Sequence, residues 1–158
     1  MSFSGEVKEE LMKHTPPARH CQLAELASIL HFCGSHTAAE GSNNLQNEEK
    51  KSIFNGEKLL IQAENEAVIR KCFTLLKKTF NINTDVLIRQ GLLPARSRTY
   101  VVAVREHEDA LRVLQAAKLL DANGEIAEDL SLVHNVIVQN TCCRRAFIRG
   151  AFLAAGSI

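Results

Sequence analysis

The chain has 158 residues, 46% of them hydrophobic, and a formal net charge of +1. This length and composition predict one globular domain of ordinary size, and no apolar run is long enough to span a bilayer. The near-neutral charge excludes a strong positive field over the whole molecule, so any nucleic-acid surface must be local. Five cysteines without a secretion signal predict reduced thiols in the cytoplasm, and we expect no membrane partner.

The first third of the chain predicts two helices. Ser4 suits the N-cap of a short helix that runs to Lys13. The helix is expected to end there because two consecutive prolines follow shortly afterwards. From Cys21 to Cys33 the apolar residues recur at the helical period, and Gly34 is expected to end this second helix. The polar stretch over residues 36–47 predicts a loop.

The middle of the chain predicts two hairpins on either side of a helix. Asn55-Gly56 lies between apolar runs and is the dipeptide that a type I′ turn requires, so strands are expected at about 50–54 and 57–63. A helix is expected from about Asn65 to Phe80, with Phe73 on its buried side. The stretches "NTDVLIRQG" and "SRTYVVAVRE" are rich in branched and aromatic residues and predict the second hairpin.

The remaining elements complete a simple pattern. The stretch from His107 to Leu119 predicts a further helix, whereas "LSLVHNVIV" fits either a short helix or a strand. The order helix, hairpin, helix, hairpin, helix indicates an α+β fold. Helices are expected to pack on one face of a mainly antiparallel sheet.

Two stretches of the chain share one pattern. "CQLAELASILHFCGS" and "CCRRAFIRGAFLAAGSI" both begin with Cys, run through apolar residues and contain a closing Gly-Ser. Small residues recur four apart in each stretch, a spacing that lets two helix backbones approach closely. Each stretch alone also fits an ordinary amphipathic helix, but the match between them predicts that residues 26–33 and 148–155 cross. The expected contact residues are Ala24, Ala27, Ser28, Gly150, Ala151 and Ala154.

These segments resemble known proteins. The paired stretches look like the two LAGLIDADG motifs of a monomeric homing endonuclease, and the elements between them resemble one repeat of that fold. More closely, "MSFSGEVKEEL" and the two paired stretches are similar to the N-terminal region of the WhiA family of bacterial sporulation and cell-division regulators. The resemblance covers essentially the whole chain, and the Cys-Cys-Arg-Arg start of the second motif is its most specific part.

The resemblance implies a division of the chain into parts. Residues 1–20 would form an N-terminal helix and linker, residues 21–125 a first LAGLIDADG-like repeat, and residues 126–158 a connector and the first helix of a second repeat. The rest of that repeat and a helix-turn-helix domain would follow in such a protein, so we expect the chain to be a fragment. The polar loop between Ser35 and Ser52 departs from the family pattern.

The resemblance also locates the positions where catalysis would occur. In active LAGLIDADG enzymes the last helical residue before each closing glycine is acidic, and the two carboxylates hold a divalent metal over the scissile phosphates. Those positions are Cys33 and Ala155 here. Alanine offers no ligand, and a thiol is poorly matched to Mg²⁺. We therefore expect no nuclease activity and no cofactor.

The second hairpin contains the candidate DNA contacts. Arginines on a protruding β-ribbon can contact phosphates or base edges, although a solvated hairpin tip is an equal alternative. Strand alternation places Arg98 and Tyr100 on one side of the strand, and we expect the other side, with Val101, Ala103 and Leu87, to face the core. The four candidate residues are Arg89, Arg96, Arg98 and Arg105.

Two functions remain open from the sequence. The first is a catalytically inactive, DNA-associated domain of a cytoplasmic, nucleoid-associated transcriptional regulator. The second is a module that binds a protein partner or a ligand, with DNA contacted only by the absent helix-turn-helix domain. The arginine hairpin favours the first, and the near-neutral charge favours the second.

Several cysteines and histidines lie close together in the sequence and are candidate metal ligands. His20-Cys21 and Cys33 with His36 flank one helix, whose ends lie roughly 20 Å apart at the helical rise per residue, so they cannot share an ion. We expect no metal site on this ground. The pair Cys142-Cys143 fits either redox-sensitive thiols or an ordinary buried residue beside a helix cap.

Overall fold

The computed structural model describes residues 2–40, 54–55, 58–90, 98–119 and 137–157. Within these ranges the helices are α1 (Phe3–Lys13), α2 (Arg19–Glu40), α3 (Glu66–Phe80), α4 (His107–Ala116) and α6 (Thr141–Ala155). The strands are β1 (Phe54–Asn55), β2 (Lys58–Ala63), β3 (Asp85–Gln90) and β4 (Arg98–Val104). They form one antiparallel sheet in the order β1-β2-β4-β3.

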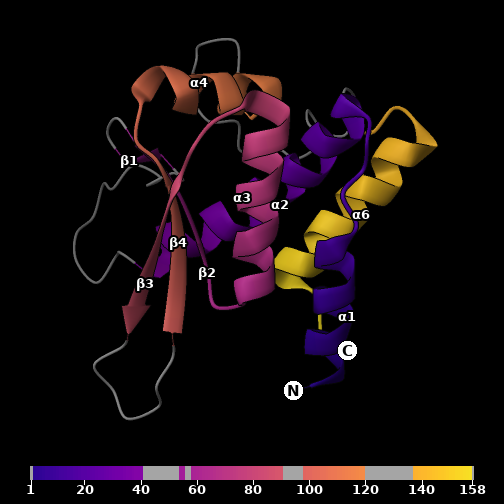
Figure 1. Ribbon diagram of the computed structural model, residues 1–158, viewed down its shortest axis with the longest axis horizontal. Helices are drawn as coiled ribbons and strands as arrows, with labels where there is room; N and C mark the ends of the chain where they lie inside the picture. Colours follow the sequence, from indigo (N-terminus) through magenta and orange to yellow (C-terminus); the bar gives the residue numbers. More distant parts are fainter. Residues whose placement is uncertain (1, 41–53, 56–57, 91–97, 120–136, 158) are drawn as a thin grey trace.

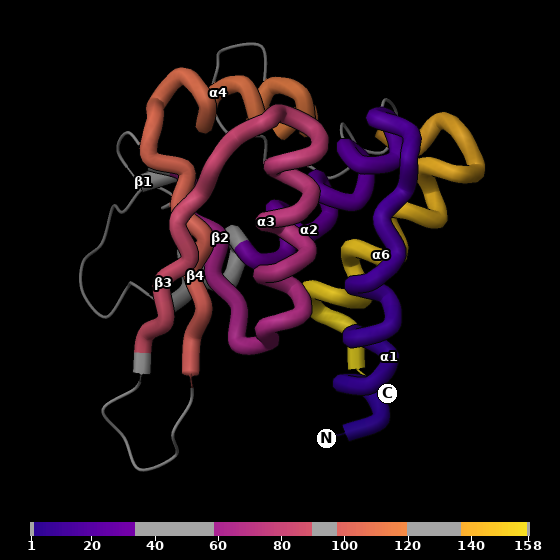
Figure 2. The backbone as a smooth tube through the Cα atoms, viewed as in Figure 1, coloured from indigo at the N-terminus to yellow at the C-terminus, as the bar shows by residue number. Residues whose placement is uncertain are grey.

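The helices and the sheet form separate layers, as predicted for an α+β fold. Figure 1 shows the sheet on the left, with α3 and α2 beside it and with α1 and α6 farther out. The start and the end of the chain lie close together, because α1 contacts α6 (Figure 2). In the described part of the chain, no helix is both long and apolar enough to cross a membrane.

The hydrophobic core lies between the sheet and the helices. Val102 and Val104 of β4 and Leu59 of β2 are at most 1% exposed and belong to the same buried cluster as the inner faces of α2 and α3. In this register Arg98 and Tyr100 lie on the same side of β4 as Val102. The predicted orientation of this strand is therefore wrong.

The residues expected to line the core instead lie on the other face of the sheet. Val101 and Ala103 are buried there, but Leu87 remains 43% exposed. Alternation of small branched residues does not distinguish the two faces, because both sides of β4 are apolar. The packing of α3 against β4 selects the side of Val102.

Several predicted boundaries need correction. The N-cap of α1 is Ser2, whose Oγ accepts a hydrogen bond from the Gly5 amide at 3.2 Å, so Ser4 lies inside the helix. Helix α2 continues through Gly34 to Glu40, so this glycine does not end it and residues 36–40 are helical. In the first hairpin, Asn55 was expected in the turn, but it belongs to β1 and pairs with Lys58 of β2.

Helix α3 follows the sequence prediction closely, with two exceptions. Its N-cap is Asn65, which accepts a hydrogen bond from Ala67 at 2.8 Å, and Asn81 ends it in the left-handed conformation with φ 57°. Phe73 was expected to be buried and is 41% exposed, whereas Lys71 is fully buried. The undecided stretch over 130–136 and the loop over 41–53 lie outside the described residues.

Candidate functional site

The candidate site is built on the contact between α2 and α6, the helices of the two matched motifs. They run side by side in the same direction, since Cys21 lies near Cys143 at one end and Cys33 lines a cavity with Ala154 at the other. Midway, a Cβ atom on Gly150 would overlap Ser28 Oγ and the carbonyl oxygen of Glu25. The two backbones therefore approach as closely as glycine permits.

The small residues singled out in the sequence lie along this contact or at its margin. Ala24, Ala27 and Ser28 are fully buried, and Gly150 is buried against them. Ala151 and Ala154 are partly exposed, and Ala154 packs against the hydrophobic core. Ser28 Oγ donates a hydrogen bond to the Glu25 carbonyl at 2.8 Å, so its hydroxyl is satisfied within its own helix.

A buried ion pair lies beside this contact, and the sequence analysis missed it. Glu25 of α2 and Lys71 of α3 are both fully buried, with Nζ 2.9 Å from Oε1, although this pair lacks the directional geometry of a hydrogen bond. Arg149 of α6 reaches the same carboxylate, with Nη2 3.2 Å from Oε2. One acidic residue within the apolar run "LAELASIL" was the available signal, but its partners are distant in sequence.

Lys71 also joins α1 to this network. Its Nζ donates hydrogen bonds to the carbonyl oxygens of His14 and Leu11 at the end of α1. Burial lowers the pKa of Lys71, while the neighbouring Glu25 carboxylate opposes that shift. The charges of Glu25, Lys71 and Arg149 thus connect four helices around the middle of the α2–α6 pair.

The carboxyl-terminal end of the helix pair opens onto a cavity of about 590 Å³. Cys33 lies in its wall, and burial raises the pKa of this thiol to about 12, with Lys8 acting in the opposite direction. Ala155, the other motif position, is exposed. Of the described residues that line the cavity, Glu64 alone provides a carboxylate. The structure therefore shows no pair of carboxylates there to bridge a catalytic Mg²⁺ among the described lining residues.

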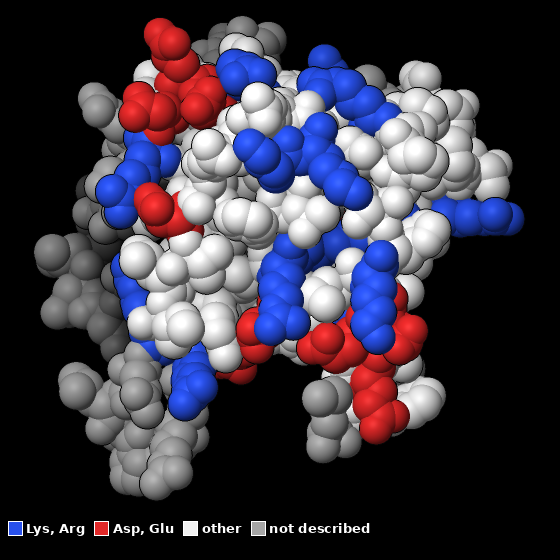
Figure 3. Space-filling view, in the orientation of Figure 1, with Lys and Arg blue, Asp and Glu red and all other residues white. Residues whose placement is uncertain are grey.

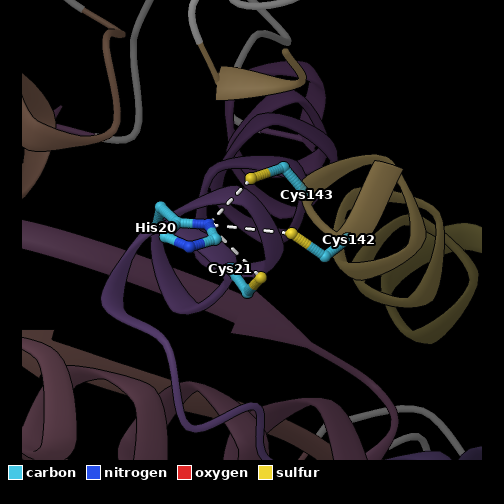
Figure 4. Close-up of side chains that lie close together, drawn as sticks. All are labelled: His20, Cys21, Cys142 and Cys143. Carbon is cyan, nitrogen blue, oxygen red and sulfur yellow. Dashed lines mark hydrogen bonds between the residues drawn. The ribbon is translucent and has the colours of Figure 1, made fainter. Parts of the chain in front are cut away.

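The amino-terminal end of the helix pair contains a cluster of potential metal ligands. His20 and Cys21 near the start of α2 face Cys142 and Cys143 near the start of α6 (Figure 4). His20 Nδ1 lies 3.1 Å from Cys143 Sγ, 3.4 Å from Cys21 Sγ and 3.9 Å from Cys142 Sγ. All four potential ligand atoms lie within 4.8 Å of one another.

Burial and proximity alter the acidity of these thiols. Burial, followed by the neighbouring thiols of Cys142 and Cys143, raises the pKa of Cys21 to about 12. The pKa of Cys143 is raised by burial and by Cys142, and a hydrogen bond to the Asn140 backbone opposes this. At neutral pH both thiols therefore keep their protons unless a cation replaces them.

His20 and Cys21 approach other potential ligands than the pair Cys33 and His36 that lies along the same stretch of sequence. Cys33 lies at the opposite end of the helix pair, in the wall of the cavity, as the helical rise required. The partners that do approach are Cys142-Cys143, which were considered only as thiols. The available signal was that both motifs open with Cys, because parallel pairing of matched helices brings their first residues together.

The candidate DNA-contacting arginines do not form one cluster. Arg89 is exposed and pairs with Thr99 across the hairpin, so both lie on the face away from α3. Arg98 is exposed on the opposite face. Arg105 follows β4 and forms an ion pair with Asp85 at 2.6 Å, which reduces its free charge. Arg96 lies outside the described residues.

Positive and negative side chains are unevenly distributed over the surface of the molecule. In Figure 3, Lys and Arg side chains gather over α3, whereas acidic side chains gather over α4 and α1. Exposed bases near the end of α3 include Arg19, Lys77 and Lys78. The positive charge of this face is therefore local, in keeping with a net charge of only +1.

Comparison with known families decides the relationship. Residues 19–120 match the family described as WhiA N-terminal LAGLIDADG-like domain. The chain belongs to the WhiA family. The matched segment starts at the first residue of α2 and extends past α4, so it includes the whole described sheet.

Curated members of the WhiA family align with the entire chain. A probable cell division protein WhiA from Lachnoclostridium phytofermentans is 46% identical over 158 residues. Proteins with the same name from Lachnospira eligens and Heliobacterium modesticaldum are 35% and 34% identical. The chain spans between 44% and 46% of the length of these WhiA relatives.

Proposed function

We propose that this chain is a catalytically inactive, DNA-associated domain of a transcriptional regulator that acts in cell division and sporulation. The cell-division part rests on WhiA relatives that bear that name. The regulator is expected to work at the nucleoid in the cytoplasm. The domain would supply a scaffold and a weak DNA surface, and a helix-turn-helix domain would read the sequence.

The residues at the two motif positions give the main support for the absence of nuclease activity. The α2–α6 contact of a LAGLIDADG-like domain is kept, yet the positions that would present carboxylates are Cys33 and Ala155. The Cys33 thiol is buried and its pKa is raised to about 12. A protonated thiol and a methyl group cannot neutralise the charge that develops on a phosphodiester during hydrolysis.

The test is cleavage of supercoiled plasmid in Mg²⁺ and in Mn²⁺. We expect no nicking above the background of a preparation that lacks the protein. The decisive control is Glu64→Ala, because Glu64 is the carboxylate in the cavity wall. Nicking that copurifies with the chain and disappears in Glu64→Ala would show that this is an active nuclease.

The DNA-binding part is supported by the hairpin formed by β3 and β4. Arg89 is exposed near the end of β3 and no described acidic residue pairs with it, so its charge is available to a phosphate. The sheet face that bears it is opposite the one with Val102, against which α3 packs. Binding through so few cations is expected to be weak and to depend strongly on salt.

A second candidate function is binding of a protein partner. A depression of about 500 Å³ lies between α3 and the hairpin. Its wall contains Phe73, Val86 and Ile88, which are 41%, 45% and 64% exposed. Exposed apolar side chains gathered in one concave site are typical of an interaction surface.

The two functions can be separated by one substitution. Ile88→Lys places a charge in the depression and leaves the arginines unchanged. If DNA affinity is retained but the regulator no longer supports normal division in cells, partner binding is favoured. If in-cell activity is also retained, the depression has no required partner, and the DNA-associated function is favoured.

A further inference from the structure

We propose that His20, Cys21, Cys142 and Cys143 form a four-coordinate zinc site that joins the beginning of α2 to the beginning of α6. The four potential ligand atoms lie within 4.8 Å of one another. They come from two helices that are far apart in the sequence, and the imidazole faces all three sulfur atoms (Figure 4). The site is separate from the catalytic positions of the LAGLIDADG motif, which lie at the other end of the helices.

The distances fit a tetrahedral ion. Zinc–sulfur bonds of about 2.3 Å and zinc–nitrogen bonds of about 2.0 Å at the tetrahedral angle separate nitrogen from sulfur by about 3.5 Å. The three observed separations from His20 Nδ1 are 3.1, 3.4 and 3.9 Å, on both sides of that value. Each observed separation therefore lies within about 0.4 Å of the value for a tetrahedral zinc ion.

The ligand types select the metal. Three cysteines and one histidine are a combination found in structural zinc sites. Thiolates are soft ligands that favour zinc over Mg²⁺ or Ca²⁺, which require oxygen ligands. With four protein ligands, the ion would have no open position for substrate. The site is therefore structural, and its role is to hold the two motif helices together.

The surroundings stabilise a thiolate-rich site. His20 and Cys21 lie in the first turn of α2, and Cys142 and Cys143 lie in the first turn of α6. Helix N-termini favour negative charge, so two of them converge on the thiolates. Three thiolates around Zn²⁺ leave a net charge of −1, and the exposed Arg144 and Arg145 follow directly in the chain. On binding, zinc displaces the thiol protons, which pass to solvent.

The cluster also has an accessible side. Cys21 and Cys143 are 6% and 3% exposed, whereas His20 and Cys142 are exposed. Zinc can thus enter from solvent while two ligands remain anchored in the core. The exposed pair provides variants that remove a ligand without creating a cavity.

Zinc uptake tests the proposal directly. The protein is purified under reducing conditions, stripped with a chelator and dialysed against Zn²⁺, and bound metal is measured by mass spectrometry. We expect one zinc per chain, and Co²⁺ should give the visible absorption of a tetrahedral thiolate site. Cys142→Ser and His20→Asn should each weaken zinc binding by roughly 100-fold or more, since changes beyond the ligands already cost 10–100-fold.

Cys33→Ala is the matched control, because Cys33 lies on the same helix, near the opposite end of the pair. It should bind zinc like the unmodified chain. Circular dichroism establishes that the exposed-ligand variants remain folded. The proposal is overturned if the reduced chain takes up no zinc, or if uptake is unchanged in Cys142→Ser and His20→Asn. It is also overturned if the chain isolated without reductant has lost two hydrogens to a disulfide among these cysteines and cannot take up zinc after reduction.

Discussion

The two ends of the α2–α6 pair differ in the chemistry that they can support. At the carboxyl-terminal end, where active LAGLIDADG enzymes hold their metal, the structure has the buried thiol of Cys33 and the methyl group of Ala155. At the amino-terminal end, three thiols and an imidazole converge within 4.8 Å. The helix pair therefore has no carboxylate at Cys33 and Ala155 at one end, and it has soft potential ligands at the other.

The helix pair is also held together by groups that lie between its two ends. Between the two ends lie the close contact at Gly150 and the buried charges of Glu25, Lys71 and Arg149. The contact at Gly150 and the pair between Glu25 and Arg149 fix the position of α6 on α2, and Lys71 connects Glu25 to α3. The following substitutions test whether the middle holds the pair and whether the ends behave differently.

Removing the buried negative charge should have the largest effect. Glu25→Gln leaves Lys71 and Arg149 without their anion, and breaking a buried pair in this way typically costs about 3–5 kcal/mol of unfolding free energy. Urea denaturation measures the loss. Glu66→Gln is the control, because its pair with Arg70 is exposed and should contribute only about 0.5 kcal/mol.

The reason for the loss can be checked with a double variant. Glu25→Gln combined with Lys71→Met removes both charges, so the remaining penalty should be smaller than that of Glu25→Gln alone. A double variant that is no more stable than the single one would show that the unpaired lysine is not the cause.

Filling the close contact should have the next largest effect. Gly150→Ala adds a Cβ that overlaps Ser28 Oγ and the Glu25 carbonyl, so α6 must move away from α2. We expect a loss of about 1–3 kcal/mol, measured from the urea midpoint at an unchanged denaturant slope. In an exposed helix the same change would stabilise by about 1 kcal/mol, so the sign of the effect is decisive.

A control for this prediction is Ala155→Leu, which adds bulk to the same helix at an exposed position. It should change stability by less than about 0.5 kcal/mol. Equal losses in the two variants would mean that α6 tolerates no larger residue anywhere and that the contact at Gly150 is not special.

Thiol reactivity should distinguish the two ends of the pair. At a free zinc concentration ten times Kd, only about a tenth of the sites are unliganded, so alkylation of the exposed Cys142 should slow about tenfold. Cys33 is buried and its pKa is raised to about 12, so it should react slowly with or without zinc. Peptide mapping after timed alkylation gives both rates. A zinc effect at Cys33 equal to that at Cys142 would contradict the separation of the two ends.

The smallest effect is expected at the hairpin. If DNA lies on the sheet face away from the helices, Arg89→Ala should reduce the slope of log K against log salt by about 0.9. Arg98→Ala should change the slope less, because Arg98 lies on the opposite face. Arg70→Ala on α3 is the control. Equal slopes in all three variants and the unmodified chain would favour the interaction module.

Much of the secondary structure was predictable from the sequence, because it depends on near neighbours. The caps and apolar period of α3, the strands of the second hairpin and the match between the two motifs are local patterns, and the α+β class followed from them. The WhiA relationship came from the resemblance of particular segments, and the family match confirms it. Local patterns were weaker at boundaries, where Ser2 replaced Ser4 as a cap and α2 continued through Gly34. There several residues satisfy the same local rule, and packing chooses among them.

The tertiary structure alone decided which distant side chains meet. The burial of Lys71, the exposure of Phe73 and the face of β4 that meets the helices all depend on how the elements pack, and both faces of β4 were apolar enough to be buried. His20 and Cys143 are 123 positions apart, so no spacing rule within a single helix connects them. The sequence by itself determined that two similar helices exist, each with cysteine near its start. Parallel packing of those helices determined that their first turns meet, because the close backbone contact at Gly150 and the Glu25–Arg149 ion pair hold the two helices in register.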